Sequence, residues 1–66
     1  MSDMLLQALK AKLEGDVAVA KANIMIYKEK SVGIGEHPQH IDECDKLIEK
    51  ISNAEEKLET LQAFKI

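Results

Sequence analysis

Little in this 66-residue sequence can stabilise a small fold through covalent cross-links. The chain has one cysteine, Cys44, so no disulfide can form within it, and an intracellular, reducing setting is the simpler expectation. It also has one proline, three glycines, two aromatic residues and no tryptophan. A chain of this length buries only about 60% of the surface that its unfolded form exposes. We therefore expect a single domain that depends on association, a bound metal or very regular helix packing.

Long hydrophobic runs and an excess of positive charge are also missing. The longest apolar run after the N-terminal segment, Ile24 to Tyr27, is far shorter than the roughly 20 residues of a membrane span. No targeting signal is recognisable. The net charge of −3 leaves no basic stripe, and two aromatic residues form no stacking platform. We expect a cytoplasmic protein that binds neither membrane nor nucleic acid.

What the sequence does contain is helix-forming residues in two long segments. Ser2 can cap a helix that we predict from Asp3 to Lys30, with Gly33 placed to end it. Pro38 suits the first position of a second helix, which we predict to run to Ala63. The connection from Ser31 to His37 is short, and the two segments are similar in length. The sequence thus predicts an all-α fold, an antiparallel two-helix hairpin.

The predicted second helix has one apolar face. Steps of three and four separate its apolar residues, with an average spacing near 3.5 that is typical of a left-handed coiled coil. These residues are Ile41, Cys44, Leu47, Ile48, Ile51, Ala54, Leu58 and Leu61. Such a helix needs one neighbour.

The predicted first helix has two apolar faces on opposite sides. The larger face consists of Leu6, Leu9, Leu13, Val17, Ala20, Ile24 and Tyr27. The second face consists of Met4, Ala8, Ala11, Gly15, Ala18, Ala22 and Met25. Its small side chains would let another helix approach closely, although alanine is also a good helix former in exposed positions.

We favour the interpretation that this second face is an interface, because Val19 and Ile26 at its margin would otherwise enlarge an exposed apolar patch. A hairpin has only one second helix to cover two faces. We therefore predict a homodimer that forms an antiparallel four-helix bundle with the first helices in the centre. A larger oligomer, or docking of a helix from another protein, would satisfy the same face.

The segment GIGEHPQHIDEC contains the residues best suited to bind a metal ion or a small ligand. His37, His40 and Cys44 could contribute to a metal or small-ligand site, since His40 and Cys44 are four residues apart on one helical face. Cys44 also belongs to the apolar stripe, where a free cysteine acts as a small hydrophobic residue. The glycines follow no strand and precede no Gly-Lys-Ser/Thr motif, so they indicate a turn. We expect no cofactor and no enzymatic activity.

The stretch from Ala22 to Leu61, with the turn SVGIGEHP followed by an acidic segment of regularly spaced Ile and Leu, resembles short proteins of large tailed bacteriophages, including marine ones. The resemblance rests mainly on the GIGEHP turn. It implies a small phage accessory protein, with a host or virion protein as a further partner, and it implies no known activity. Residues and resemblance together predict a self-associating interaction module.

Overall fold

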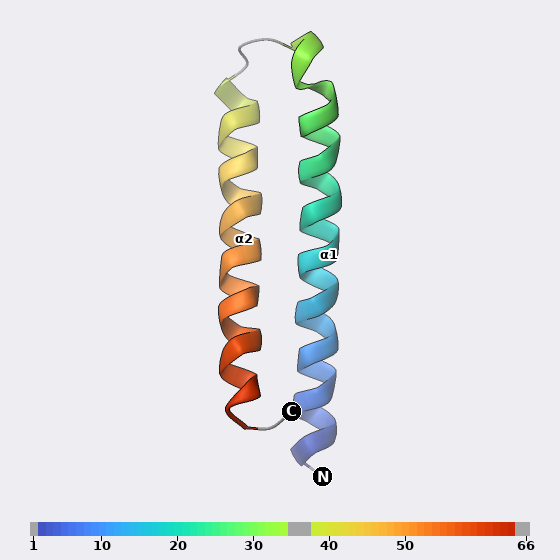
Figure 1. The fold of residues 1–66 in the computed structure, drawn as a ribbon, viewed down its shortest axis with the longest axis vertical. Coiled ribbons are helices and arrows are strands. Elements are labelled where there is room, and N and C mark those ends of the chain that lie inside the picture. The colour runs from blue at the N-terminus through green and yellow to red at the C-terminus, as the bar shows by residue number, and fades with distance from the viewer. Residues whose placement is uncertain (1, 35–37, 65–66) are drawn as a thin grey trace.

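The computed structural model describes residues 2–34 and 38–64, and these residues form two long helices that lie side by side (Figure 1). Helix α1 spans Ser2–Ile34 and helix α2 spans Pro38–Gln62. Both termini lie at the same end of the molecule, so the helices are antiparallel (Figure 1). No strand occurs in the described part of the chain. The all-α hairpin expected from the sequence is therefore confirmed.

Helix α1 is longer than the sequence analysis predicts. The sequence predicts an end at Lys30 and places residues 31–34 in the loop, whereas the structure keeps these four residues helical, Gly33 included. The physical reason is that glycine costs a helix only about 1 kcal/mol relative to alanine, and the helix-breaking proline comes later, at Pro38. The rest of the predicted loop, residues 35–37, lies outside the described residues.

Helix α2 begins at Pro38, the expected first residue, and ends at Gln62, one residue before the predicted end. Beyond it, the chain makes a tight turn. The amide of Ala63 donates to the carbonyl of Thr60 at 3.0 Å, and the amide of Phe64 donates to the carbonyl of Leu61 at 2.9 Å. These i→i−3 bonds satisfy carbonyl groups that the end of an α-helix leaves unpaired.

The core is a thin layer between the helices, and three of its four buried residues lie in the half of the rod near the termini. Leu13, Ala54 and Leu61 form a buried cluster, against which Leu6, Val17 and Leu58 pack while remaining partly exposed. Ala20, at 1% exposure, is the most deeply buried of the core residues. No polar or charged side chain is buried among the described residues. The larger predicted face of α1 and the stripe of α2 are thus the surfaces that meet.

Three residues of those predicted faces are less covered than expected. Ile41 is 72% exposed, Ile48 53% and Leu9 39%. They lie at the edges of their stripes, and one neighbouring helix covers only the centre of a wide apolar stripe. They belong to the predicted apolar stripes but are not part of the buried core.

The molecule is a rod of 50 × 14 × 13 Å with a radius of gyration of 15.2 Å. A compact chain of 66 residues would have a radius of gyration of about 11 Å. The long dimension matches a helix of 33 residues, which at about 1.5 Å per residue spans roughly 50 Å. Within the described ranges, neither helix has a stretch long and apolar enough to cross a membrane.

Candidate functional site

The second apolar face of α1 is the most extensive candidate site, and we call it the outer face. It consists of the seven residues predicted from the sequence, namely Met4, Ala8, Ala11, Gly15, Ala18, Ala22 and Met25. All seven are exposed. Met4 is 79% exposed and Met25 is 48% exposed. Because α2 covers the opposite side of α1, none of the described residues shields this face.

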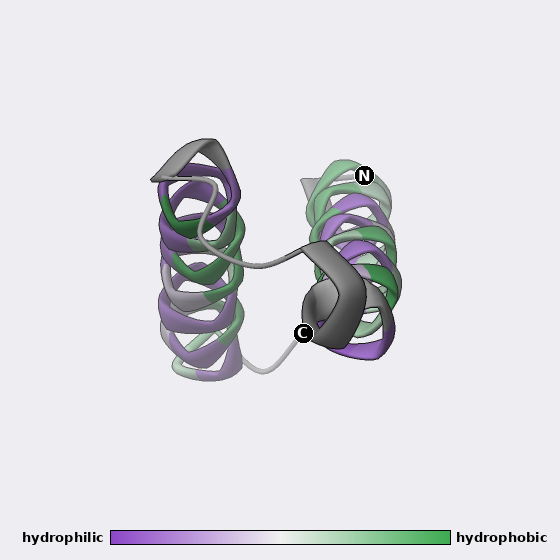
Figure 2. Cartoon of the chain, turned by 90° about the horizontal axis from the view of Figure 1, so that it is seen from above, coloured by the Kyte–Doolittle hydropathy of each residue, from purple (hydrophilic) through white to green (hydrophobic). Residues whose placement is uncertain are grey.

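Exposed branched side chains border the outer face on one edge. Leu5, Val19 and Ile26 are 76%, 62% and 50% exposed. Seen along the rod, α2 is hydrophobic mainly on the side that faces α1, whereas α1 is hydrophobic on its far side as well (Figure 2). An exposed patch of this extent on a small protein typically marks an interaction surface.

Gly15 lies at the middle of the outer face, and its surroundings are open. A Cβ atom added at this position would meet no other atom within 4 Å. The glycine is therefore not required by any contact within the hairpin. In an interior helical position it costs about 1 kcal/mol relative to alanine, so its presence favours a role in close approach of another helix.

The loop end of the hairpin holds the residues that the sequence singles out for ligand binding. The rings of Tyr27 and His40 meet edge to face, with centroids 5.4 Å apart and an interplanar angle of 66°. Cys44 is a free, half-buried thiol on α2. His37 lies outside the described residues. Among the residues that are described, no group of three or more His, Cys, Asp or Glu side chains is placed to hold a metal ion.

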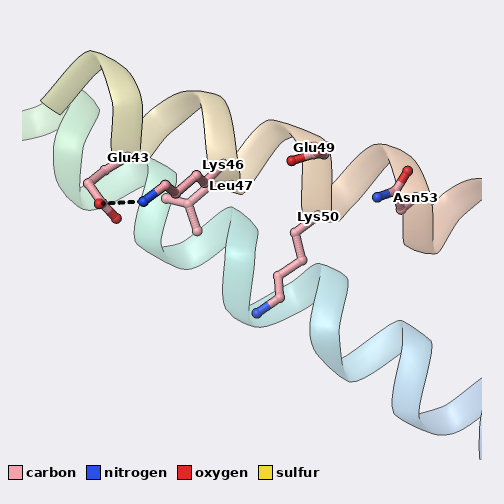
Figure 3. Close-up of a pocket in the computed structure, with 6 residues that line it drawn as sticks. All are labelled: Glu43, Lys46, Leu47, Glu49, Lys50 and Asn53. Atoms are coloured by element: carbon pink, nitrogen blue, oxygen red, sulfur yellow. Dashed lines mark ion pairs between the residues drawn. The ribbon is translucent and has the colours of Figure 1, made fainter. Parts of the chain in front are cut away.

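A shallow groove on α2 has polar walls. It has a volume of about 440 Å³ and is lined by Glu43, Lys46, Leu47, Glu49, Lys50 and Asn53 (Figure 3). Lys46 and Glu43, one turn apart, form an ion pair at 3.6 Å, and both side chains are largely exposed. Exposed pairs of this kind contribute little binding energy or stability. The groove therefore offers solvated charges and no enclosed space that would exclude water from a reaction.

One electrostatic cluster escapes the sequence analysis. The ammonium of Lys12 donates a hydrogen bond of 2.8 Å to Asp16 Oδ2, one helical turn away on α1. This bond is the main cause of a lowered pKa of the Asp16 carboxyl, and the positive charges of Lys50 and Lys57 on α2 lower that pKa further. The i,i+4 spacing could have indicated the first contact. The contribution from α2 depends on how the helices are aligned.

A second polar contact joins the helices directly. Lys21 Nζ and Glu55 Oε2 are 3.9 Å apart, and their side chains are 61% and 55% exposed. An exposed pair at this distance contributes little to stability. It also places Lys21 at the edge of α1 between α2 and the outer face.

Comparison of the chain with models of known protein families, with curated protein sequences and with solved structures gives no match.

Proposed function

We propose that this chain is a self-associating helical module whose outer face binds a second copy. The homodimer would be a four-helix bundle with the two α1 helices in the centre and the α2 helices outside. The observation that carries the proposal is the outer face itself, which is apolar along six turns of α1 and lies on the side away from α2.

The total exposed surface supports association. The chain exposes 5431 Å², whereas a compact folded monomer of this mass exposes about 4200 Å². The excess of one chain exceeds the roughly 800 Å² that each partner of a stable protein interface buries. A thin core also limits the stability of the isolated hairpin, because only Leu13, Ala20, Ala54 and Leu61 are buried hydrophobic residues among those described. Dimerisation would add buried apolar area that the hairpin lacks.

Substitution of Gly15 by leucine tests the role of the outer face. Within the hairpin the new side chain enters open space, and leucine is the better helix former, so the helix content of the monomer should rise or stay unchanged. In a dimer the same side chain would hold the two α1 helices apart. We expect Gly15→Leu to weaken dimerisation by about tenfold or more, which corresponds to about 1.4 kcal/mol.

Size-exclusion chromatography with light scattering, at several micromolar concentrations, measures the effect. Ser52→Leu is the matched control, because Ser52 is an exposed residue of α2 outside the apolar stripe. It should leave the dimer intact. Equal behaviour of the two variants, or a wild-type chain that is monomeric throughout, would overturn the proposal.

A further inference from the structure

The two edges of the outer face differ chemically, and this difference bears on how two copies would pair. One edge carries the exposed apolar residues Leu5, Val19 and Ile26 together with Lys12. The other edge carries Glu14 in the first half of the face and Lys21 in the second half, both exposed. The inference rests on the proposed function, because it specifies how the two copies of the proposed homodimer pair.

We infer that two copies pair antiparallel through their outer faces, with the two-fold axis between Gly15 and Ala18, so that Glu14 of each copy faces Lys21 of the other. A closed dimer of identical chains has such an axis, and each interface residue then occurs twice. The occupant of the outer face is therefore a second copy in one orientation and one alignment.

The sizes of the side chains suit this alignment. The axis brings Gly15 of one copy opposite Ala18 of the other, and Ala11 opposite Ala22. The smallest residues thus occupy the middle of the interface, where two crossing helices come closest. Met25 is opposite Ala8 near each end, where a long flexible side chain can fill the widening space between the helices.

Charge complementarity favours the antiparallel orientation. In an antiparallel helix pair each edge of the interface meets the same edge of the partner, running in the opposite direction, whereas in a parallel pair it meets the other edge. The antiparallel pair therefore places Glu14 against Lys21 twice. A parallel pair would place Glu14 of each copy beside Val19 of the other. Neither Glu14 would then have a basic neighbour across the interface.

Lys21 already lies near Glu55 of its own α2, at a distance of 3.9 Å with 61% of the lysine side chain exposed. An exposed ammonium can be shared between two carboxylates, since it has three donor hydrogens. Lys21 therefore lies at the edge where Glu14 of the second copy would arrive.

The apolar edge is complementary in the same orientation. Leu5 would meet Ile26 of the second copy, so that two exposed branched side chains cover one another. Lys12 would meet Val19, with its methylene groups over the valine while its ammonium stays on Asp16, as in the free chain. Both edges thus point to one arrangement.

Charge reversal tests the inference. Glu14→Lys and Lys21→Glu each convert two attractive contacts of the dimer into repulsive ones, and each variant alone should dimerise about tenfold more weakly than wild type. An equimolar mixture of the two variants restores attraction at both contacts. At one contact the side chain introduced by Glu14→Lys faces that introduced by Lys21→Glu, and at the other the native Glu14 faces the native Lys21. The mixture should dimerise with close to wild-type affinity.

Sedimentation equilibrium of the variants separately and mixed, with circular dichroism to verify that each remains helical, provides the measurement. Glu56→Lys, a reversal at an exposed position of α2, is the matched control and should retain wild-type dimerisation. A wild-type dimer whose variants are not rescued by mixing would overturn the antiparallel alignment while leaving the proposed function standing. A wild-type monomer would overturn both.

Disulfide cross-linking gives a readout that does not depend on charge. In a Cys44→Ala background, Ala11→Cys and Ala22→Cys chains should cross-link with each other when mixed. Neither should cross-link with itself, because its two copies would be about 16 Å apart along the axis, and a disulfide needs Cα atoms within about 7 Å. Self-linking of each variant, or absence of mixed cross-links in a chain that dimerises, would contradict the inference.

Discussion

Helix α2 has apolar residues on one side, which faces α1, whereas α1 has apolar residues on two sides and α2 covers one of them (Figure 2). The difference separates two tasks within one short chain. The inner face of α1, with Leu13 at 4% exposure, forms the hairpin, and the outer face is left for association. Substitutions on the two faces of α1 should therefore affect different properties. Those on the inner face should change the stability of the hairpin, and those on the outer face should change dimerisation.

The largest expected effect is on the inner face. Leu13→Ala removes a leucine that is 4% exposed and belongs to the central cluster with Ala54 and Leu61. Such truncations cost about 2–5 kcal/mol, which approaches the total stability of a domain of this size. We expect a much lower urea midpoint, or loss of helix content, measured by circular dichroism. Ile41→Ala, at a position 72% exposed, should change stability by less than about 0.5 kcal/mol.

Two alanines of α1 sharpen the comparison, because they are two residues apart but lie on opposite faces. Ala20 is 1% exposed and Ala22 is exposed. Ala20→Leu should destabilise the hairpin by about 1–3 kcal/mol, since no space exists for the larger side chain between the helices. Ala22→Leu should leave the hairpin stable and weaken dimerisation. Urea unfolding and light scattering of both variants distinguish the effects, and a reversed outcome would mean that the faces are assigned incorrectly.

Gly15→Ala should have a moderate stabilising effect. The added Cβ meets no atom within 4 Å in the hairpin, and alanine is favoured over glycine in a helix by about 1 kcal/mol. Alanine is small enough to remain in a closely packed interface. We expect a higher midpoint of unfolding with dimerisation retained, in contrast to Gly15→Leu. A destabilised variant would indicate that Gly15 has a structural role within the hairpin.

The smallest effect concerns Asp16, whose pKa is lowered by the hydrogen bond from Lys12 and by the lysines of α2. A carboxyl whose pKa is lower in the folded state contributes stability above its unfolded pKa of about 4, and loses it as the pH falls through the lowered folded value. Wild type should therefore be slightly more stable than Asp16→Asn at neutral pH, and the difference should vanish in acid. Thermal unfolding of both chains at neutral pH and in acid measures this difference in stability, with Glu56→Gln as the control.

Much of the hairpin follows from local rules. The steps of three and four predict which residues of α1 face α2, and Leu13, Ala20, Ala54 and Leu61 are buried as that pattern requires. Pro38 marks the start of α2, because proline suits the first turn of a helix. The seven residues of the outer face are likewise found exposed on α1, although their role as an interface remains a prediction.

Other features depend on balances or alignments that a pattern does not contain. The continuation of α1 through Gly33 reflects a cost of about 1 kcal/mol that the surrounding helix can offset. The exposure of Ile41 and Ile48 follows from the narrow contact that one helix makes with another. The effect of Lys50 and Lys57 on Asp16 requires the alignment of α1 with α2. Each of these features depends on how the two helices lie in three dimensions.

The central claim is that the outer face of α1 binds a second copy of the chain. Sedimentation equilibrium of the wild-type chain across the micromolar range tests it most directly. The account predicts an average mass that rises with concentration from that of one chain towards twice that value. A mass equal to one chain at every concentration would contradict it.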